Sequence, residues 1–137
     1  MTQITVDKNC DSGYTDFSKE SGGIHIIGDF FNCLSGKEHM LSAEKLEVFC
    51  SEMVRQSGLT EVGKAFVQFP QAGVTGTVLL AESHVAIHTW PEKDYLTLDV
   101  FVCNVTQDNT DRARALFESF VNLFQPEKIK RQEVYRD

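Results

Sequence analysis

The chain alternates between stretches in which every second residue is apolar and stretches in which apolar residues recur at helical spacing. Period-two alternation is typical of a strand with one buried face, and it is clearest over 95–103, where all even-numbered residues are apolar. A β-branched and aromatic run over 24–31, which ends at the Ser35-Gly36 turn, indicates another strand. We expect further strands over 62–69, 74–81, 84–90 and 128–135.

Two segments show the spacing of an amphipathic helix. Over 42–56, Ser42 is placed as the N-cap and Gly58 follows the end. Over 110–124, the apolar stripe ends before Pro126, which cannot continue a helix. The apolar positions are Leu46, Phe49, Cys50, Met53 and Val54 in the first helix and Ala113, Leu116, Phe117, Phe120, Val121 and Phe124 in the second.

The order of these elements predicts the architecture. It reads strand, helix, strand, strand and then strand, strand, helix, strand, so the two halves mirror each other in element type. Each helix needs an apolar face of the sheet to pack on, so we expect an α+β fold, a two-layer structure with helices packed on an antiparallel sheet. Residues 1–22 are polar without periodicity and are expected to form a flexible tail, which leaves 23–137 as a single domain.

Composition narrows the classes of partner and site. The formal net charge of −7 argues against a nucleic-acid partner, because such proteins bind phosphates through clustered Lys and Arg. No apolar stretch approaches the roughly 18 residues that cross a bilayer and no leader opens the chain, so we expect a cytoplasmic protein without a membrane partner. The spacing of Cys10, Cys33, Cys50 and Cys103 fits neither a disulfide scaffold nor a zinc site, so no metal is expected.

Residues 82–103 gather most of the reactive side chains and read ESHVAIHTWPEKDYLTLDVFVC. The string ESHVAIHTWPE, followed by DVFVC, resembles the processing and active-site segment of the prokaryotic S-adenosylmethionine decarboxylases. The resemblance extends to an upstream Gly-Val-Thr-Gly turn over 73–76 and to a Gly-x-His opening strand, and it covers about 23–134. A match of this length, with a correctly spaced downstream Cys, is far more specific than a short glycine motif.

The resemblance implies a chain that cuts itself between Glu82 and Ser83. In the family, the serine hydroxyl attacks the preceding carbonyl, and the resulting ester eliminates to leave a pyruvoyl group, which in this chain would form from Ser83. Serine suits this chemistry because its β-oxygen can be first a nucleophile and then a leaving group. The pyruvoyl ketone forms a Schiff base with the substrate amine and accepts electrons as carbon dioxide leaves, so no other cofactor is needed. Without the flanking match, Ser83 would read as an ordinary strand serine.

Four further residues match family positions around this bond. His88 matches the histidine that accepts the Ser α-proton during processing, a task that suits an imidazole because it titrates near neutral pH. Cys103 matches the general acid of decarboxylation. Thr75 stands where relatives carry a serine whose hydroxyl assists processing, and a plain strand role remains open for it. His84 also matches, but a local structural role is equally open.

Strand register places these groups relative to one another. If 91–94 form a loop that pairs position 90 with 95, counting back puts Cys103 opposite Glu82. Ideal alternation, however, points Ser83 and His88 to opposite faces of the sheet. We therefore expect a distorted backbone at the scissile bond.

Substrate choice follows from weaker matches. Phe69 stands where relatives place an aromatic ring that stacks on adenine, and Glu92 where they place a carboxylate for the ribose hydroxyls. Asp29 matches an acidic position near the processing site. The chain departs from the family at three positions: it has Ile24 where relatives have Arg, Val67 where they have His, and Asn104 where they have Gly. These departures concern fine substrate specificity more than processing.

The expected function is decarboxylation of S-adenosylmethionine to the aminopropyl donor for spermidine synthesis. Two alternatives stay open: a pyruvoyl-dependent decarboxylase of free ornithine or arginine, and a processing-dead homologue that regulates an active copy. The resemblance also implies a homodimer of cleaved two-chain protomers, with active sites at the interface.

Overall fold

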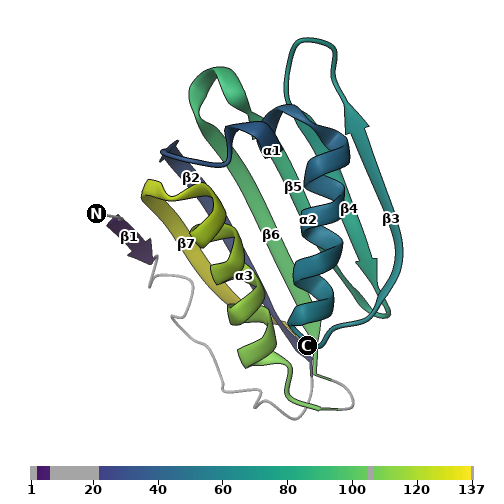
Figure 1. Ribbon diagram of the computed structural model, residues 1–137. Helices are drawn as coiled ribbons and strands as arrows, with labels where there is room; N and C mark the ends of the chain where they lie inside the picture. The colour runs from purple at the N-terminus through teal and green to yellow at the C-terminus, as the bar shows by residue number, and fades with distance from the viewer. Residues whose placement is uncertain (1–2, 7–21, 105–106, 137) are drawn as a thin grey trace.

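Seven strands form one sheet with the order β1-β7-β2-β6-β5-β4-β3, and the helices cover one of its faces (Figure 1). The computed structural model describes residues 3–6, 22–104 and 107–136. The strands are β1 (Gln3–Val6), β2 (Gly23–Cys33), β3 (Glu61–Gln68), β4 (Val74–Leu80), β5 (Ser83–Trp90), β6 (Tyr95–Cys103) and β7 (Pro126–Arg136). The helices are α1 (Lys37–Leu41), α2 (Ala43–Gln56), the 3-10 helix η2 (Pro91–Lys93) and α3 (Thr110–Phe124). The predicted α+β two-layer fold is confirmed.

Local signals explain the helix boundaries. Ser42 is the N-cap of α2, and its hydroxyl accepts a hydrogen bond from the Lys45 backbone N–H at 3.2 Å. Gly58 follows this helix with a φ of +81°, a conformation that glycine adopts without strain. The prediction for α3 matches its observed bounds, whereas α1 was missed because its five residues are too few to show a periodicity.

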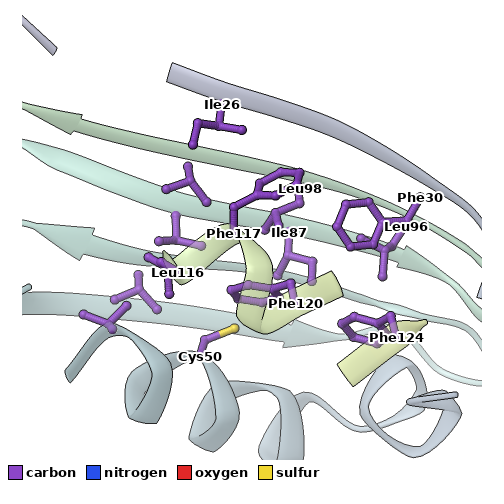
Figure 2. Packing of buried hydrophobic residues seen from close by; sticks show 14 of the residues in the cluster. Ile26, Phe30, Cys50, Ile87, Leu96, Leu98, Leu116, Phe117, Phe120 and Phe124 are labelled. Carbon is purple, nitrogen blue, oxygen red and sulfur yellow. The ribbon is translucent and has the colours of Figure 1, made fainter. Parts of the chain in front are cut away.

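The core lies between the helices and one face of the sheet (Figure 2). Alternate residues of the central strands point toward the helices, and each is almost fully buried. Gly28 of β2 leaves room for a helix side chain, since a Cβ there would lie 2.6 Å from the Phe117 ring. The largest buried side chains include Ile26, Phe30, Ile87, Leu96 and Leu98 from the sheet and Leu46, Leu116, Phe117, Phe120 and Phe124 from the helices.

The amino-terminal tail differs from the prediction. Gln3–Val6 form β1, which pairs in parallel with β7, whereas all the other neighbouring strands are antiparallel. A segment of four residues shows too little alternation to be recognised as a strand. The rest of the predicted tail, apart from Gly22, lies outside the described residues.

The other face of the sheet is open. Its side chains come from the odd-numbered residues of β2, β4 and β6 and from the even-numbered residues of β5, and most are half-buried. In Figure 1 no helix of the described chain covers this face. None of the described helices is long and apolar enough to span a membrane.

Candidate active site

The bond between Glu82 and Ser83 lies in the tight turn that joins β4 to β5. Leu80 pairs with Ser83 across this turn, so only two residues, both exposed, connect the strands. Ser83 is half-buried as the first residue of β5, one position earlier than the sequence predicts. The bond at which the sequence predicts cleavage is therefore accessible, while the strands on either side of it are held in the sheet.

Cys103 contacts the carbonyl of the scissile bond directly. Its Sγ donates a hydrogen bond to the Glu82 carbonyl oxygen at 2.9 Å. The predicted register explains this contact, since Trp90 pairs with Tyr95 and the ladder continues to His84 and Phe101. Burial raises the pKa of the Cys103 thiol, the nearby Glu82 carboxylate raises it further, and Arg136 opposes both effects. The thiol is thus kept protonated at neutral pH and available as a proton donor.

A pocket of about 460 Å³ opens beside this bond. It lies between the β4–β5 turn, the end of β6, the segment after α2 and the start of α3, which Figure 1 shows together at the lower end of the sheet. Its lining includes Glu82, Ser83, Cys103, Asn109 and Arg112. The pocket gives a small molecule access to Ser83 and Cys103 at the same time.

His84 lies on the open face in a row of rings that crosses three strands. His25 pairs with Phe101 across β2 and β6, and Phe101 pairs with His84 across β6 and β5. The His84 ring centroid is 6.1 Å from that of His25 and 5.7 Å from that of Phe101. Burial lowers the pKa of His84, and His25 and Arg136 lower it further against the opposing charge of Asp99. The imidazole next to the scissile bond is therefore kept neutral.

His88 and Thr75 lie together but far from Ser83 of the same chain. The two residues pair across β4 and β5, and the Thr75 Oγ1 lies 3.1 Å from the His88 Nδ1. His88 is five positions after Ser83, which corresponds to about 16 Å along a strand. The pairing of β5 is regular from Ser83 onward, so alternation holds and the two side chains point to opposite faces. The pairing of β5 shows no irregularity between Ser83 and His88, so no distortion within this strand turns the two side chains to the same face.

The two expected substrate-binding residues lie at the same far end of the sheet. Phe69 follows β3 and is 47% exposed, and Glu92 is exposed in η2, directly after Trp90. The length of β5 puts this end about 23 Å from Ser83. Asp29 pairs with Thr97, which in turn pairs with His88, so Asp29 also belongs to the His88 group and not to the Ser83 group.

The structure therefore divides the predicted residues into two groups. Ser83, Glu82, Cys103 and His84 lie at one end of the sheet, and His88, Thr75, Asp29, Phe69 and Glu92 lie farther along it. Sequence reasoning missed Arg112, a cation in the pocket beside Ser83. Its position in the first turn of α3 carried no signal, because only the fold brings that turn next to the β4–β5 turn.

Comparisons with known proteins show which family the chain is similar to. A sequence model described as S-adenosylmethionine decarboxylase matches residues 24–137. The S-adenosylmethionine decarboxylase proenzyme of Archaeoglobus fulgidus is 38% identical over 109 residues, which cover 79% of this chain and 91% of that protein. The proenzyme of Thermosipho africanus is 35% identical over 116 residues, which cover 85% of this chain and 81% of that protein. The crystal structure of the adenosylmethionine decarboxylase from Aquifex aeolicus has a TM-score of 0.75 and 28% identity, covering 85% of this chain and 92% of that one.

Proposed function

Because this chain belongs to the S-adenosylmethionine decarboxylase family, we propose that it is a proenzyme that cuts itself before Ser83 and then decarboxylates S-adenosylmethionine. The product is the aminopropyl donor for spermidine synthesis. The observation that carries the proposal is the hydrogen bond of 2.9 Å from the Cys103 thiol to the Glu82 carbonyl, next to the Ser83 hydroxyl. A donor at this oxygen polarises the bond that must break.

The cleavage balances with one water molecule. The Ser83 Oγ attacks the Glu82 carbonyl carbon, negative charge develops on the carbonyl oxygen beside the Cys103 thiol, and the C–N bond gives way to an ester. Removal of the Ser83 α-proton then expels Glu82 as a carboxylate and leaves a dehydroalanine, which water converts to a pyruvoyl group with loss of ammonia. Two chains result, 1–82 and 83–137.

The residues around Ser83 suit the second reaction as well. When present, the pyruvoyl group supplies an electron-withdrawing ketone that accepts the electron pair released with carbon dioxide. The protonated Cys103 thiol can return a proton to the substrate α-carbon, a role that its raised pKa favours at neutral pH. The pocket beside Ser83 and Cys103 gives the methionine portion of the substrate a path to both residues.

The separation of the two groups of residues supports a homodimer with shared sites. The His88 group is about 16 Å or more from Ser83 in its own chain, which is too far for proton transfer. The open face of the sheet offers a surface for a second copy. A twofold axis between two such faces, running across the strands, would bring the Ser83 end of each chain against the His88 end of its partner. His88 and Thr75 then act in processing, and Phe69 and Glu92 bind the nucleoside, across the interface.

Mass spectrometry and a decarboxylase assay test the proposed function. The purified wild type should give two fragments, 1–82 and 83–137, and Ser83→Ala should stay at 15.4 kDa. The cleaved protein should release label from carboxyl-labelled S-adenosylmethionine and not from ornithine or arginine. An uncleaved wild type would instead favour a regulatory homologue. Release of label from carboxyl-labelled ornithine or arginine would identify the protein as a decarboxylase of a free basic amino acid.

A further inference from the structure

Arg112 is a cation that lines the same pocket as Glu82 and Ser83. Its guanidinium donates long hydrogen bonds to two neutral acceptors, the Gly58 carbonyl oxygen at 3.5 Å and the Asn109 Oδ1 at 3.3 Å. Across 3–6, 22–104 and 107–136, it forms no ion pair with a carboxylate. The pocket therefore contains a guanidinium whose charge no described carboxylate pairs with.

Self-cleavage creates an anion in this pocket. The neutral Glu82 carbonyl becomes a carboxylate, so the end of fragment 1–82 carries two negative charges where the intact chain has one. Strand pairing in β4 ends at Leu80, and Ala81 and Glu82 are exposed. Once the bond is cut, two residues without strand partners can swing away from the sheet.

The new carboxylate has to leave Cys103 for the second reaction to proceed. In the intact chain the thiol donates to the Glu82 oxygen, and the Glu82 side chain contributes to the raised thiol pKa. If the new carboxylate stayed in place, its charge would hold the thiol proton more tightly and its oxygen atoms would occupy the substrate's path. A second partner for the carboxylate removes both obstacles.

We propose that Arg112 binds the new C-terminal carboxylate of Glu82 in this pocket and so frees Cys103 and the group formed at Ser83 for the substrate. A guanidinium suits this task because it binds a carboxylate through two parallel hydrogen bonds. The inference rests on the proposed self-cleavage. It makes Arg112 a positioning residue, which acts on the reaction through the chain end that it holds.

Alkylation of Cys103 tests the inference. Fragment 83–137 contains Cys103 as its single cysteine, so in cleaved proteins the intact mass of this fragment reports the reaction of Cys103 with iodoacetamide directly. In uncleaved proteins, which carry Cys10, Cys33 and Cys50 in the same chain, the mass of the proteolytic peptide that contains Cys103 gives the same readout. The variants are Arg112→Gln and Arg112→Lys, each in the wild type and in the uncleaved Ser83→Ala protein. Trimming of fragment 1–82 by carboxypeptidase gives a second readout, because a bound chain end is protected from the protease.

We expect all the proteins that keep Ser83 to be cleaved to the same extent. In cleaved R112Q, alkylation of Cys103 at pH 7.5 should fall about threefold to tenfold, because the carboxylate that stays beside the thiol raises its pKa and lowers the thiolate fraction. Carboxypeptidase should release Glu82 faster, and R112K should restore both values. In the Ser83→Ala background, R112Q should change nothing, because no new carboxylate exists there.

Cleaved R112Q that matches the wild type in both readouts would overturn the inference. So would an equal fall in alkylation in the uncleaved background, which would assign the effect to structure and not to the chain end. A wild type that stays uncleaved would overturn the proposed function, and this inference with it.

Discussion

Chains that lack His88 should be cleaved when a partner supplies that residue. The perturbation is co-expression of two variants with tags of different mass, Ser83→Ala and His88→Ala. Each variant alone should stay uncleaved, since the first lacks the nucleophile and the second the proton acceptor. In a mixed dimer, the His88→Ala chain keeps Ser83 and faces an intact His88 on its partner.

The magnitude follows from the geometry and from random pairing. Within one chain, His88 is about 16 Å from Ser83 and on the opposite face of the sheet, so transfer in the same chain contributes nothing. With equal amounts of both variants, about half of the His88→Ala chains pair with a Ser83→Ala partner if dimers form at random. About half of these chains should therefore be cleaved.

Intact mass of the tagged chains measures the cleaved fraction. The matched control replaces the Ser83→Ala partner with a Ser83→Ala/His88→Ala double variant, which forms the same dimers but supplies no imidazole at that position. If the cleaved fraction stays near zero with both partners, or if His88→Ala cleaves alone, the assignment of His88 to the partner's site is refuted. In the second case His84, the neutral imidazole beside Ser83, becomes the base to test.

Three other outcomes follow from the structure. Phe117→Ala removes a fully buried ring and should lower the free energy of unfolding in urea by about 3–5 kcal/mol, whereas the exposed Val48→Ala should stay within about 0.5 kcal/mol; equal effects would contradict the packing. In uncleaved Ser83→Ala, Glu82→Gln removes a negative charge that raises the pKa of the Cys103 thiol. The pKa should therefore fall, and the larger thiolate fraction at pH 7.5 should make alkylation of Cys103 faster. Slower alkylation would contradict the assigned effect of Glu82. Phe69→Ala should raise the KM for S-adenosylmethionine about tenfold, from about 1–1.5 kcal/mol of lost ring stacking, and an unchanged KM in a steady-state assay would separate Phe69 from the nucleoside.

Much of the fold could be predicted because local signals agree with tertiary packing. The alternation of β6, the Ser42 cap and the stripe of α3 each reflect a single element, and each prediction is confirmed. The contact of Cys103 with Glu82 could also be predicted, since one loop length fixes the register between β5 and β6.

The remaining features depend on distances that no local pattern encodes. The conflict in alternation between Ser83 and His88 was visible in the sequence, whereas their separation along β5 depends on the regular pairing of that strand. Assembly of two chains, as we propose, brings a partner's His88 to the Ser83 end of the sheet. Arg112 lines the same pocket as Glu82 and Ser83 only because α3 starts where β6 ends, next to the β4–β5 turn.

The strand order has a consequence for what happens after the chain is cut. Fragment 1–82 contributes β1, β2, β3 and β4, and fragment 83–137 contributes β5, β6 and β7, so β2 lies between two strands of the other fragment. The two fragments therefore alternate within one sheet, and neither can dissociate without the loss of hydrogen bonds along both edges of β2. After the proposed cleavage, the protein would be one folded body made of two polypeptides, which should survive dilution, chromatography and turnover as a unit and separate only when the sheet itself unfolds.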